Sequence, residues 1–544
     1  MPVQSAVVPS VELSSVIVKE RVELSSRTSQ FRYTSILILL AILLVGGIAR
    51  YYRLGEIPRG LWMDEAADAN DAARAAANHH YQIFYRADAG REGLWINLMS
   101  LSISWFGHTA FAVRFWSPLA GLLSVLFIYL LGTRWFSKRI GLIAAWFLGT
   151  SFWAIAFSRF SARGALVPLF VTATLYLLQR AFDSEGRAAW FYAAAGGIIY
   201  GWGFYTYIAF RITPLLIAAF LILYWRSGVV PRRFFQTAFL WLAAALATAM
   251  PIGIYFLRNP QDFFSRVSQV SFTAGSRPLL DLFRSIIRTL LMFNFRGSSN
   301  WRHNLPGSPE LIFPVGLLFA LGIWVAFKKY RRNRYQLWRY ATVLTWFAVL
   351  LIPAMLTRES VPHALRSIGA LPAAVLLAAI GTDWLLARGS GHKQFFSGVL
   401  IFVALSGAGD LYRYFVVWAK SPQVRNAFQY PLLEASQEIT SLPPNIRLLV
   451  LVDPPDFDWR PTGFRHANPN GASILLPETA QVPIFVSSNR PNTAYVLSQD
   501  LATRGDLLRL GCGSKLLGPS SSPTFILVQR SQCKPEITAM RLPK

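Results

Sequence analysis

The stretch GLWMDEAADANDAARAAAN, residues 60–78, follows the first apolar run of the chain and sets Asp64 beside Glu65. Its many alanines predict a helix from about Asp64. On that helix Asp64, Asp68 and Asp71 lie at i, i+4 and i+7, on one face. The stretch fits a solvated acidic face of a surface helix as well as a carboxylate base held at a membrane surface.

The composition indicates a membrane protein that crosses the bilayer many times. Hydrophobic residues make up 53% of the chain and charged residues only 15%, whereas soluble domains carry about 25% charged residues. The net charge is +26, but Lys and Arg fall mostly in short loops between apolar runs. Membrane topology and anionic lipid explain this excess better than nucleic acid, for which there is no aromatic–basic recognition module.

Apolar runs long enough to cross a bilayer, or nearly so, recur along most of the chain. They lie at 34–50, 112–133, 140–157, 164–181, 190–207, 212–225, 235–257, 311–327, 338–356, 367–386 and 394–415. A shorter run at 93–107 is interpreted as a juxtamembrane or re-entrant helix. The sequence therefore predicts an all-α polytopic protein with about eleven spans, and a count of 11–13 is compatible with the soft boundaries.

Basic loops between these runs fix the expected orientation. An N-terminal tail, 1–33, and the basic turns near 134–139, 226–233, 328–334 and 388–393 fall on the cytoplasmic side by the positive-inside rule. The first outer loop, 51–92, then faces the opposite side, and so does the C-terminus. The sequence predicts a multi-pass protein of the cell membrane with its polar candidate site outside the cytoplasm.

The pattern changes after the membrane domain, 34–415. Residues 416–544 contain short β-rich runs separated by Pro, Gly, Asn and Ser, which predicts a small extracytoplasmic α/β domain. Cys512 and Cys533 both lie in it and could pair there, although two thiols are weak evidence for a disulfide.

Several outer-face cations are candidates for holding a phosphate. Arg91 stands at the start of an apolar run, at the depth of lipid headgroups. The plainer explanation of an arginine there is that its side chain extends along the membrane interface to keep its charge in water. Arg159 and Arg163 are four residues apart and share a face if their helix continues, and paired guanidinium groups suit a phosphate. His363 and Arg366, three residues apart, could share a target.

Aromatic and polar residues at the same face are candidates for sugar or acceptor contacts. Tyr205 and Tyr207 with Arg211 suit a sugar or a lipid headgroup, and equally an interfacial aromatic belt. Trp301 and His303 lie in a loop, RGSSNWRHNLPGSPE, that either covers a substrate or is a plain connection. Asp68 on the acidic helix completes this group.

Together these residues give a site with an acidic pole and a basic remainder. Such polarity suits a reaction in which a carboxylate takes a proton from an acceptor and cations stabilise a departing phosphate. A donor delivered by the bilayer would also explain why the chain contains no nucleotide-binding glycine loop.

In this arrangement the chain resembles the polyprenyl-phosphate-sugar-dependent glycosyltransferases of the GT-C superfamily. It is most similar to glycosyltransferase family 39, which includes protein O-mannosyltransferases and aminoarabinose transferases. The resemblance covers about 50–390 and rests on the order of WMDEA (62–66), FGHTAFAVRFWSPLAGLLSVLFIYLLGTRWFSKRIGLIAAWFLGTSFWAIAFSRFSAR (106–163), YTYIAFRITP (205–214) and PHALRSIGALP (362–372).

The resemblance implies that Asp64 is the catalytic base, with Glu65 as its acidic neighbour. It also implies a polyprenyl-phosphate-linked hexose or pentose donor, inversion at the anomeric carbon, and a basic residue near Arg91 that meets the lipid phosphate. Many relatives carry an acid shortly after the turn that matches SRFSAR, but Gly164 and Ala165 follow here. This departure leaves the need for a divalent cation open. The acceptor, whether protein, lipid or glycan, is not specified.

Two hypotheses of other classes remain. A lipid-linked-sugar flippase or transporter would show internal repeats and charges at mid-depth of its spans, whereas the sequence has no clear repeat and gathers its charges at one face. A membrane scaffold that displays the C-terminal domain would make no use of Asp64.

Overall fold

A computed structural model of the chain describes most of the membrane domain and parts of the C-terminal region. The described residues are 33–87, 90–264, 278–332, 337–357, 360–389, 391–430, 447–451, 493–498, 514–517 and 525–529. Nearly all of the expected N-terminal tail, both cysteines, and residues 358 and 359 lie outside them.

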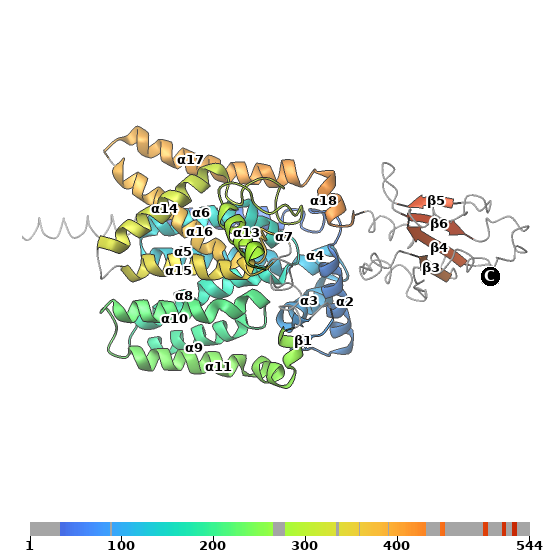
Figure 1. Cartoon of the computed structure of the whole chain (residues 1–544), viewed down its shortest axis with the longest axis horizontal. Helices are drawn as coiled ribbons and strands as arrows, with labels where there is room; N and C mark the ends of the chain where they lie inside the picture. The colour runs from blue at the N-terminus through green and yellow to red at the C-terminus, as the bar shows by residue number, and fades with distance from the viewer. Residues whose placement is uncertain are drawn as a thin grey trace, which may run out of the picture.

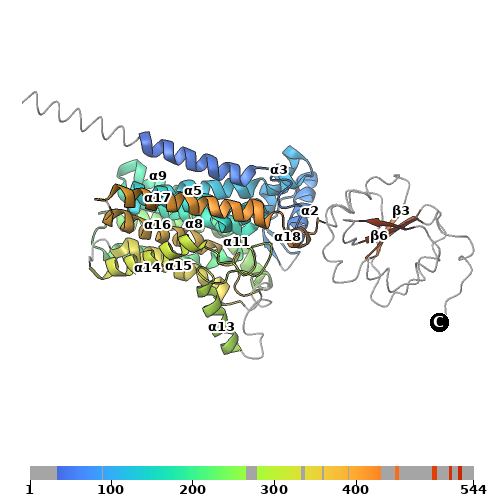
Figure 2. The same cartoon turned by 90° about the horizontal axis from the view of Figure 1, so that it is seen from above.

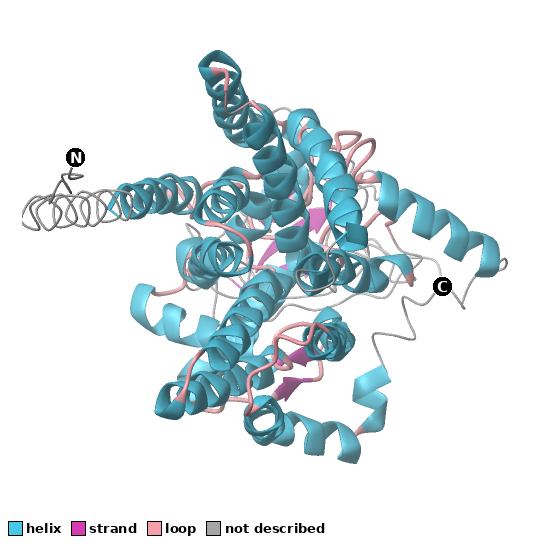
Figure 3. Cartoon of the chain, turned by 90° about the vertical axis from the view of Figure 1, so that its left-hand side faces the viewer, coloured by secondary structure: helices cyan, strands magenta, loops and turns pink. Residues whose placement is uncertain are grey.

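The membrane domain is a bundle of long helices that run side by side between two ends (Figures 1 and 2). The helices of this bundle are Tyr33–Tyr51, α5 (Trp116–Trp135), α6 (Lys138–Thr150) with the short α7 (Phe152–Arg159) after it, α8 (Leu166–Asp183), α9 (Gly186–Gly203), α10 (Thr213–Arg226), α11 (Phe234–Arg258), α14 (Phe313–Arg332), α15 (Leu337–Met355), α16 (Leu371–Arg388) and α17 (Lys393–Tyr412). Seen end-on, most of the helices point toward the viewer (Figure 3).

Short elements gather at the end drawn on the right of Figure 1. They include α2 (Met63–Asn78), β1 (Phe84–Tyr85), β2 (Arg91–Glu92), α3 (Gly93–Phe106), α4 (Ala110–Arg114) and α18 (Pro422–Ala427). Helix α13 (Pro278–Leu291) instead projects from the side of the bundle (Figure 2). Single turns Arg163–Ala165, Ile208–Ile212 and Ile368–Ala370 precede long helices, and a π-helical segment, Arg413–Trp418, extends α17.

Among the described residues, eight helices are long and apolar enough to cross a membrane. The pair α6 and α7, bent by 54°, would be a ninth span. The expected count of eleven is higher because the runs at 190–207 and 311–327 form α9 and α14, which pack in the same bundle but are not among the eight. Glycines, aromatic residues and Arg187 dilute the apolar character of α9. The run at 93–107 forms the 14-residue helix α3, too short for a span of about 20 residues.

The expected basic turns lie together at the end opposite the short elements. Helix α5 begins beside α4 at the right-hand end of Figure 1, so the turn after it, with Arg134 and Lys138, lies at the left-hand end. The turn between α10 and α11 lies at that end too (Figure 1). The charge asymmetry seen in the sequence therefore corresponds to two physically different ends of the bundle.

A buried ion pair holds the irregular segment between the first helix and α2. The Arg114 guanidinium donates to both oxygens of Glu65, at 2.9 and 3.1 Å, and both side chains are 0% exposed. The same guanidinium donates to the backbone carbonyls of Leu54, Pro58 and Gly60. Backbone groups that have no helix partners are thereby satisfied, which irregular backbone requires when it is buried.

The expected C-terminal domain, 416–544, begins with the end of the π-helical segment and α18. Beyond residue 430, the described residues form a four-stranded sheet of order β3-β4-β6-β5, with β3 (Arg447–Leu451), β4 (Thr493–Ser498), β5 (Ser514–Leu517) and β6 (Phe525–Gln529). Strands β3 and β4 are parallel, and the other two pairs are antiparallel. A parallel pair of strands requires a crossover connection. Such connections are also a feature of the α/β class that the sequence predicts.

We expect Arg114→Met to lower the free energy of unfolding by about 3–5 kcal/mol, because it leaves the Glu65 carboxylate buried without its partner. Arg134→Met removes a half-exposed pair with Asp183 and should cost less than about 1 kcal/mol. Thermal unfolding in neutral detergent measures both variants. Equal losses of stability in the two variants would show that the buried Arg114–Glu65 pair contributes no more than the half-exposed Arg134–Asp183 pair.

Candidate functional site

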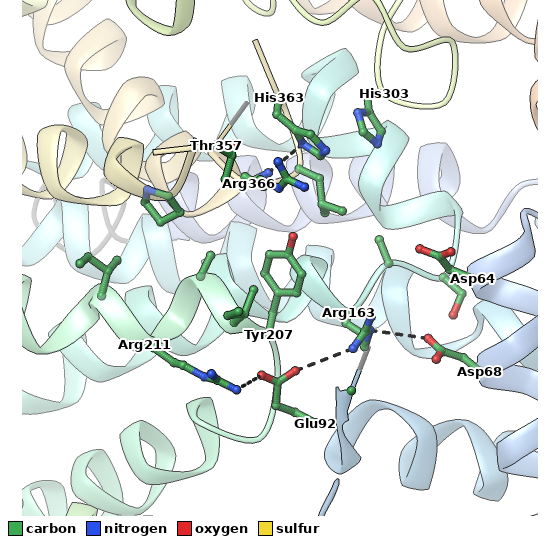
Figure 4. Close-up of a pocket in the computed structure, with 18 of the residues that line it drawn as sticks. Asp64, Asp68, Glu92, Arg163, Tyr207, Arg211, His303, Thr357, His363 and Arg366 are labelled. Carbon is green, nitrogen blue, oxygen red and sulfur yellow. Dashed lines mark hydrogen bonds and ion pairs between the residues drawn. The ribbon is translucent and has the colours of Figure 1, made fainter. Parts of the chain in front are cut away.

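A cavity of about 650 Å³ opens among the loops at the end of the bundle that carries α2 and α3. Its polar lining comes from seven separate segments of the chain: Asp64, Asp68, Glu92, Ser161, Arg163, Tyr207, Arg211, Asp262, Arg302, His303, Thr357, His363 and Arg366. Trp62, Phe84, Phe160 and Phe263 are among its apolar walls. Figure 4 shows the principal polar side chains converging on one space.

The acidic pole comes from the first turns of α2. Glu65 caps this helix by accepting a hydrogen bond from the Trp62 backbone N–H at 2.9 Å. The helix places Asp64 and Asp68 one turn apart, and both line the cavity. Asp64 is exposed, and its carboxylate forms no hydrogen bond or ion pair with any residue that the structure describes. It is therefore available to a bound molecule.

Asp68 differs from Asp64 in being buried and paired. It accepts a hydrogen bond from Arg91 at 2.7 Å and lies 3.8 Å from Arg163. Burial raises the pKa of Asp68 above its usual value, although Arg163 and Arg91 act in the opposite direction. Its carboxylate thus positions arginines rather than facing the open cavity alone.

A line of alternating charges runs from Asp68 through Arg163 and Glu92 to Arg211 (Figure 4). Arg211 donates to Glu92 at 2.9 Å, whereas Arg163 lies 3.8 Å from both Glu92 and Asp68. Those separations exceed hydrogen-bond length, and within the described residues the Arg163 side chain donates no hydrogen bond. Its planar set of N–H groups can therefore serve an anion in the cavity.

Opposite this line, His303 and His363 lie against each other with ring centroids 5.0 Å apart. Burial, together with the charges of Arg302 and Arg366, holds the pKa of both imidazoles well below its ordinary value. Both rings are therefore neutral at neutral pH. His363 Nδ1 accepts a hydrogen bond from the Arg366 backbone N–H at 3.3 Å, and His303 Nδ1 is buried without a partner in the described part of the chain.

The structure brings eight of the residues singled out in the sequence to this cavity. They are Asp64, Asp68, Arg163, Tyr207, Arg211, His303, His363 and Arg366. They come from segments up to 302 positions apart, from Asp64 to Arg366. Only the bundle places them together, since their spacing in sequence shows no common period.

Two of the predicted phosphate-binding arginines do not line it. Helix α7 ends at Arg159 and does not continue to Arg163, so the condition for a helical face shared by the two arginines is not met. Arg159 instead donates to the backbone carbonyls of residues 49, 50, 52 and 57. Arg91 is buried behind α2, where it donates to Asp68 and Asp71.

Three other candidates also lie outside the cavity lining. Glu65 is fully occupied by Arg114 and by the backbone N–H groups of Trp62 and Ser161. The Tyr205 hydroxyl donates to the backbone of α11 at Thr248. Trp301 offers its carbonyl oxygen to the Trp418 indole at 2.7 Å.

The cavity also contains residues that the sequence did not mark as site residues. Glu92 and Arg302 are neighbours of candidates, so their positions in the loops were the available signal. Arg302 lies over the Trp62 ring, 3.3 Å from its centroid. Asp262 and Thr357 gave no signal, because only the packing of α11 and α15 at this end brings them in. Within the described residues, no group of three or more His, Cys, Asp or Glu is arranged to hold a metal ion.

The fold and this cavity can be compared with known proteins. Residues 93–255 match the family model described as dolichyl-phosphate-mannose-protein mannosyltransferase. The chain is 27% identical over 331 residues to undecaprenyl phosphate-alpha-4-amino-4-deoxy-L-arabinose arabinosyl transferase 2 of Proteus mirabilis, covering 58% of this chain and 54% of that protein. It is 35% identical over 120 residues to the corresponding transferase of Pectobacterium carotovorum, or 21% and 20% of the two chains. The chain thus spans about half the length of the first relative and less of the second.

Solved structures show a similar fold over most of the chain. ArnT from Cupriavidus metallidurans bound to undecaprenyl phosphate matches with a TM-score of 0.59 at 14% identity, over 91% of this chain and 97% of that one. AglB from Archaeoglobus fulgidus, an archaeal oligosaccharyltransferase in complex with an inhibitory peptide and a dolichol-phosphate, matches with 0.53 at 14% identity, over 91% and 74%. The chain is a multi-pass membrane protein with the GT-C fold. The resemblance to the GT-C superfamily that the sequence showed is confirmed.

The loop that brings His303 to the cavity contains a buried carboxyl group. Glu310 accepts a hydrogen bond from the Ser298 backbone N–H at 2.8 Å, and its second oxygen is buried without a partner in the described residues. Burial raises the pKa of Glu310 to about 8. The loop is thus held by a carboxyl group that is protonated at neutral pH.

The stability of the protein should therefore depend on pH through Glu310. The folded-state pKa lies above the unfolded value, so the contribution is complete below the unfolded pKa and is lost as pH rises through about 8. We expect the thermal midpoint of the native chain to fall between pH 5 and pH 9, and to fall less in Glu310→Gln. Parallel curves for the two proteins would contradict this assignment.

Proposed function

We propose that this protein is a membrane glycosyltransferase that moves a sugar from a polyprenyl-phosphate-linked donor to an acceptor outside the cytoplasm. The observation that carries the proposal is the Asp64 carboxylate, which is unpaired within the described chain. It shares a cavity with the Arg163 guanidinium, which lies 3.8 Å from Asp68 and Glu92 and donates no hydrogen bond to a described residue. An available base and an available cation are the two groups that such a transfer needs. The relatives named above are transferases of a sugar carried by undecaprenyl phosphate.

The proposed step is a single displacement at the anomeric carbon. The acceptor hydroxyl, or another nucleophilic group, gives its proton to Asp64 as its heteroatom bonds to that carbon. The bond between the anomeric carbon and the phosphate oxygen breaks, and its electron pair leaves with the polyprenyl phosphate. Attack opposite the leaving group inverts the configuration, and a hexose or a pentose can react in this way.

Arginines of the cavity stabilise the charge that develops on the departing phosphate. Arg163 offers its N–H groups directly, and Arg366 lies on the wall beside the neutral His363 ring. Glu92 keeps Arg211 and Arg163 oriented, which avoids reorganisation during the reaction. Tyr207 projects into the middle of the cavity (Figure 4), where its ring can pack on a sugar face.

The sidedness of the site follows from the charges of the bundle. The basic turns lie at the end opposite the cavity, and the positive-inside rule places such turns in the cytoplasm. The cavity then opens at the outer surface, at the level where a donor phosphate in the outer leaflet would lie. The acceptor, whether protein, lipid or glycan, approaches from the aqueous side.

The first test is sugar transfer by protein reconstituted in liposomes with radiolabelled polyprenyl-phosphate sugars. Asp64→Asn keeps the size of the side chain and removes the base, so we expect a loss of transfer of about a hundredfold or more. Asp183→Asn, at the opposite end of the bundle, is the matched control and should transfer normally. Assays with magnesium ions and with a chelator measure any cation requirement at the same time.

The other outcomes of this assay are equally informative. Equal transfer by the native chain and Asp64→Asn would remove Asp64 from the mechanism. Movement of labelled lipid between leaflets without cleavage of the sugar would replace the transferase with a lipid-linked-sugar flippase.

Arg163→Gln should act on donor phosphate rather than on proton transfer. We expect it to reduce kcat/KM for the donor by about tenfold to a hundredfold, since a charge-assisted contact contributes about 1.5–3 kcal/mol. The dependence of rate on acceptor pKa should stay as in the native chain. A variant that loses this dependence while its kcat/KM for the donor stays normal would assign Arg163 to the acceptor instead.

A further inference from the structure

A second pocket lies outside the candidate site, between the first and last long helices of the bundle. Its volume is about 840 Å³, and Val45, Ile48, Leu411 and Phe415 form its apolar wall. The two helices meet there through Tyr52 and Phe415, whose rings are 6.2 Å apart in an edge-on arrangement. Figure 2 shows the first helix (dark blue) beside α17 (orange) along this side of the bundle.

The pocket has a basic rim at the same end of the bundle as the cavity. Four cations line it, Arg53, Arg59, Lys420 and Arg425, against the single carboxylate of Glu56. Arg53 is already paired with Glu56. The rim therefore keeps a net charge of +3, from four cations and one anion, within the described residues.

Two of these guanidinium groups are held in place by an aromatic ring. Arg59 and Arg425 both stack on the Tyr430 ring, at 5.6 and 4.5 Å from its centroid. Stacking on an aromatic face orients a cation and leaves its charge in place. Arg59 and Lys420 are exposed and form no ion pair with any described residue. The rim thus presents oriented positive charges that can bind an anion.

The position of this charge argues for a lipid. The apolar wall continues into exposed side chains of both helices, among them Leu44, Ile48, Leu405 and Val416. Such surfaces face acyl chains in a bilayer. A basic cluster at the end opposite the cytoplasmic turns also runs against the positive-inside bias, so topology does not account for it. Basic pockets between membrane helices bind acidic headgroups.

We propose that this pocket binds one anionic membrane lipid, with its phosphate on the basic rim and its acyl chains along the apolar wall. The binding is separate from the proposed transfer reaction and does not depend on it. The segment 52–62 lies between the lipid pocket and the catalytic cavity, with Arg59 on one side and Trp62 on the other. A bound lipid would therefore pack against the outer side of the loop that leads into Asp64.

The test compares lipids on the purified full chain in neutral detergent. Binding of phosphatidylglycerol and of phosphatidylcholine is measured by native mass spectrometry and by thermal midpoint. We expect phosphatidylglycerol to bind and to raise the midpoint, and phosphatidylcholine to do neither. The double variant Arg59→Gln/Lys420→Gln should bind phosphatidylglycerol about thirtyfold more weakly, from the loss of two surface charge contacts.

The control variant is Lys138→Gln/Arg187→Gln, which removes two exposed cations at the other end of the bundle and should bind as the native chain does. The midpoints of all three proteins without lipid report on folding. Equal affinity of the native chain and the double variant for phosphatidylglycerol would overturn the proposal. Equal binding of the two lipids would overturn it as well. Inorganic phosphate that reproduces the shift would assign the rim to free phosphate and reject the lipid.

Discussion

The arrangement of the end of the bundle that holds the cavity depends on one buried carboxylate. Glu65 accepts from Arg114 on α4, from the backbone at Trp62 and from the backbone at Ser161. It thereby joins α4 to two segments that line the cavity, and it binds Arg114, which holds the loop 54–60 through its carbonyls. A charged group that folding removes from water needs such partners, because burying it unpaired is strongly unfavourable. The adjacent Asp64 is left facing the cavity because its neighbour is the one turned inward.

The same principle divides the arginines of this end into two groups. Arg50, Arg91, Arg114 and Arg159 are fully buried, and most of their N–H groups donate to carbonyl or carboxylate oxygens of the protein. Arg163 is partly exposed and stays beyond hydrogen-bond distance of its acidic neighbours. A guanidinium group has five N–H donors in a rigid fork, so it can serve either as a support for irregular backbone or as a receptor for an anion. The excess of basic residues in the chain therefore has structural as well as functional sources.

Two pockets of different chemistry flank the segment 52–62. The cavity on one side combines acids, arginines and neutral imidazoles, as suits chemistry on a polar substrate. The pocket on the other side joins an apolar wall to a basic rim, as suits an amphiphile. Arg114 and Arg159 hold the backbone of this segment by donating hydrogen bonds to the carbonyls of Pro58 and Ile57.

The sequence by itself determined the class of the protein. Apolar runs, basic turns and the motif order around WMDEA were enough for a polytopic GT-C fold, the helix after residue 62 and the candidates Asp64, Arg163 and His363, because such signals are local in the chain. It could not separate Arg159 from Arg163, or Glu65 from Asp64, since neighbouring residues of like charge carry the same local signal. Only the tertiary structure decided which of each pair is buried against backbone and which faces the cavity. It also brought in Asp262 and Thr357, and opened the pocket between the first and last helices, because packing between distant segments leaves no periodic trace in sequence.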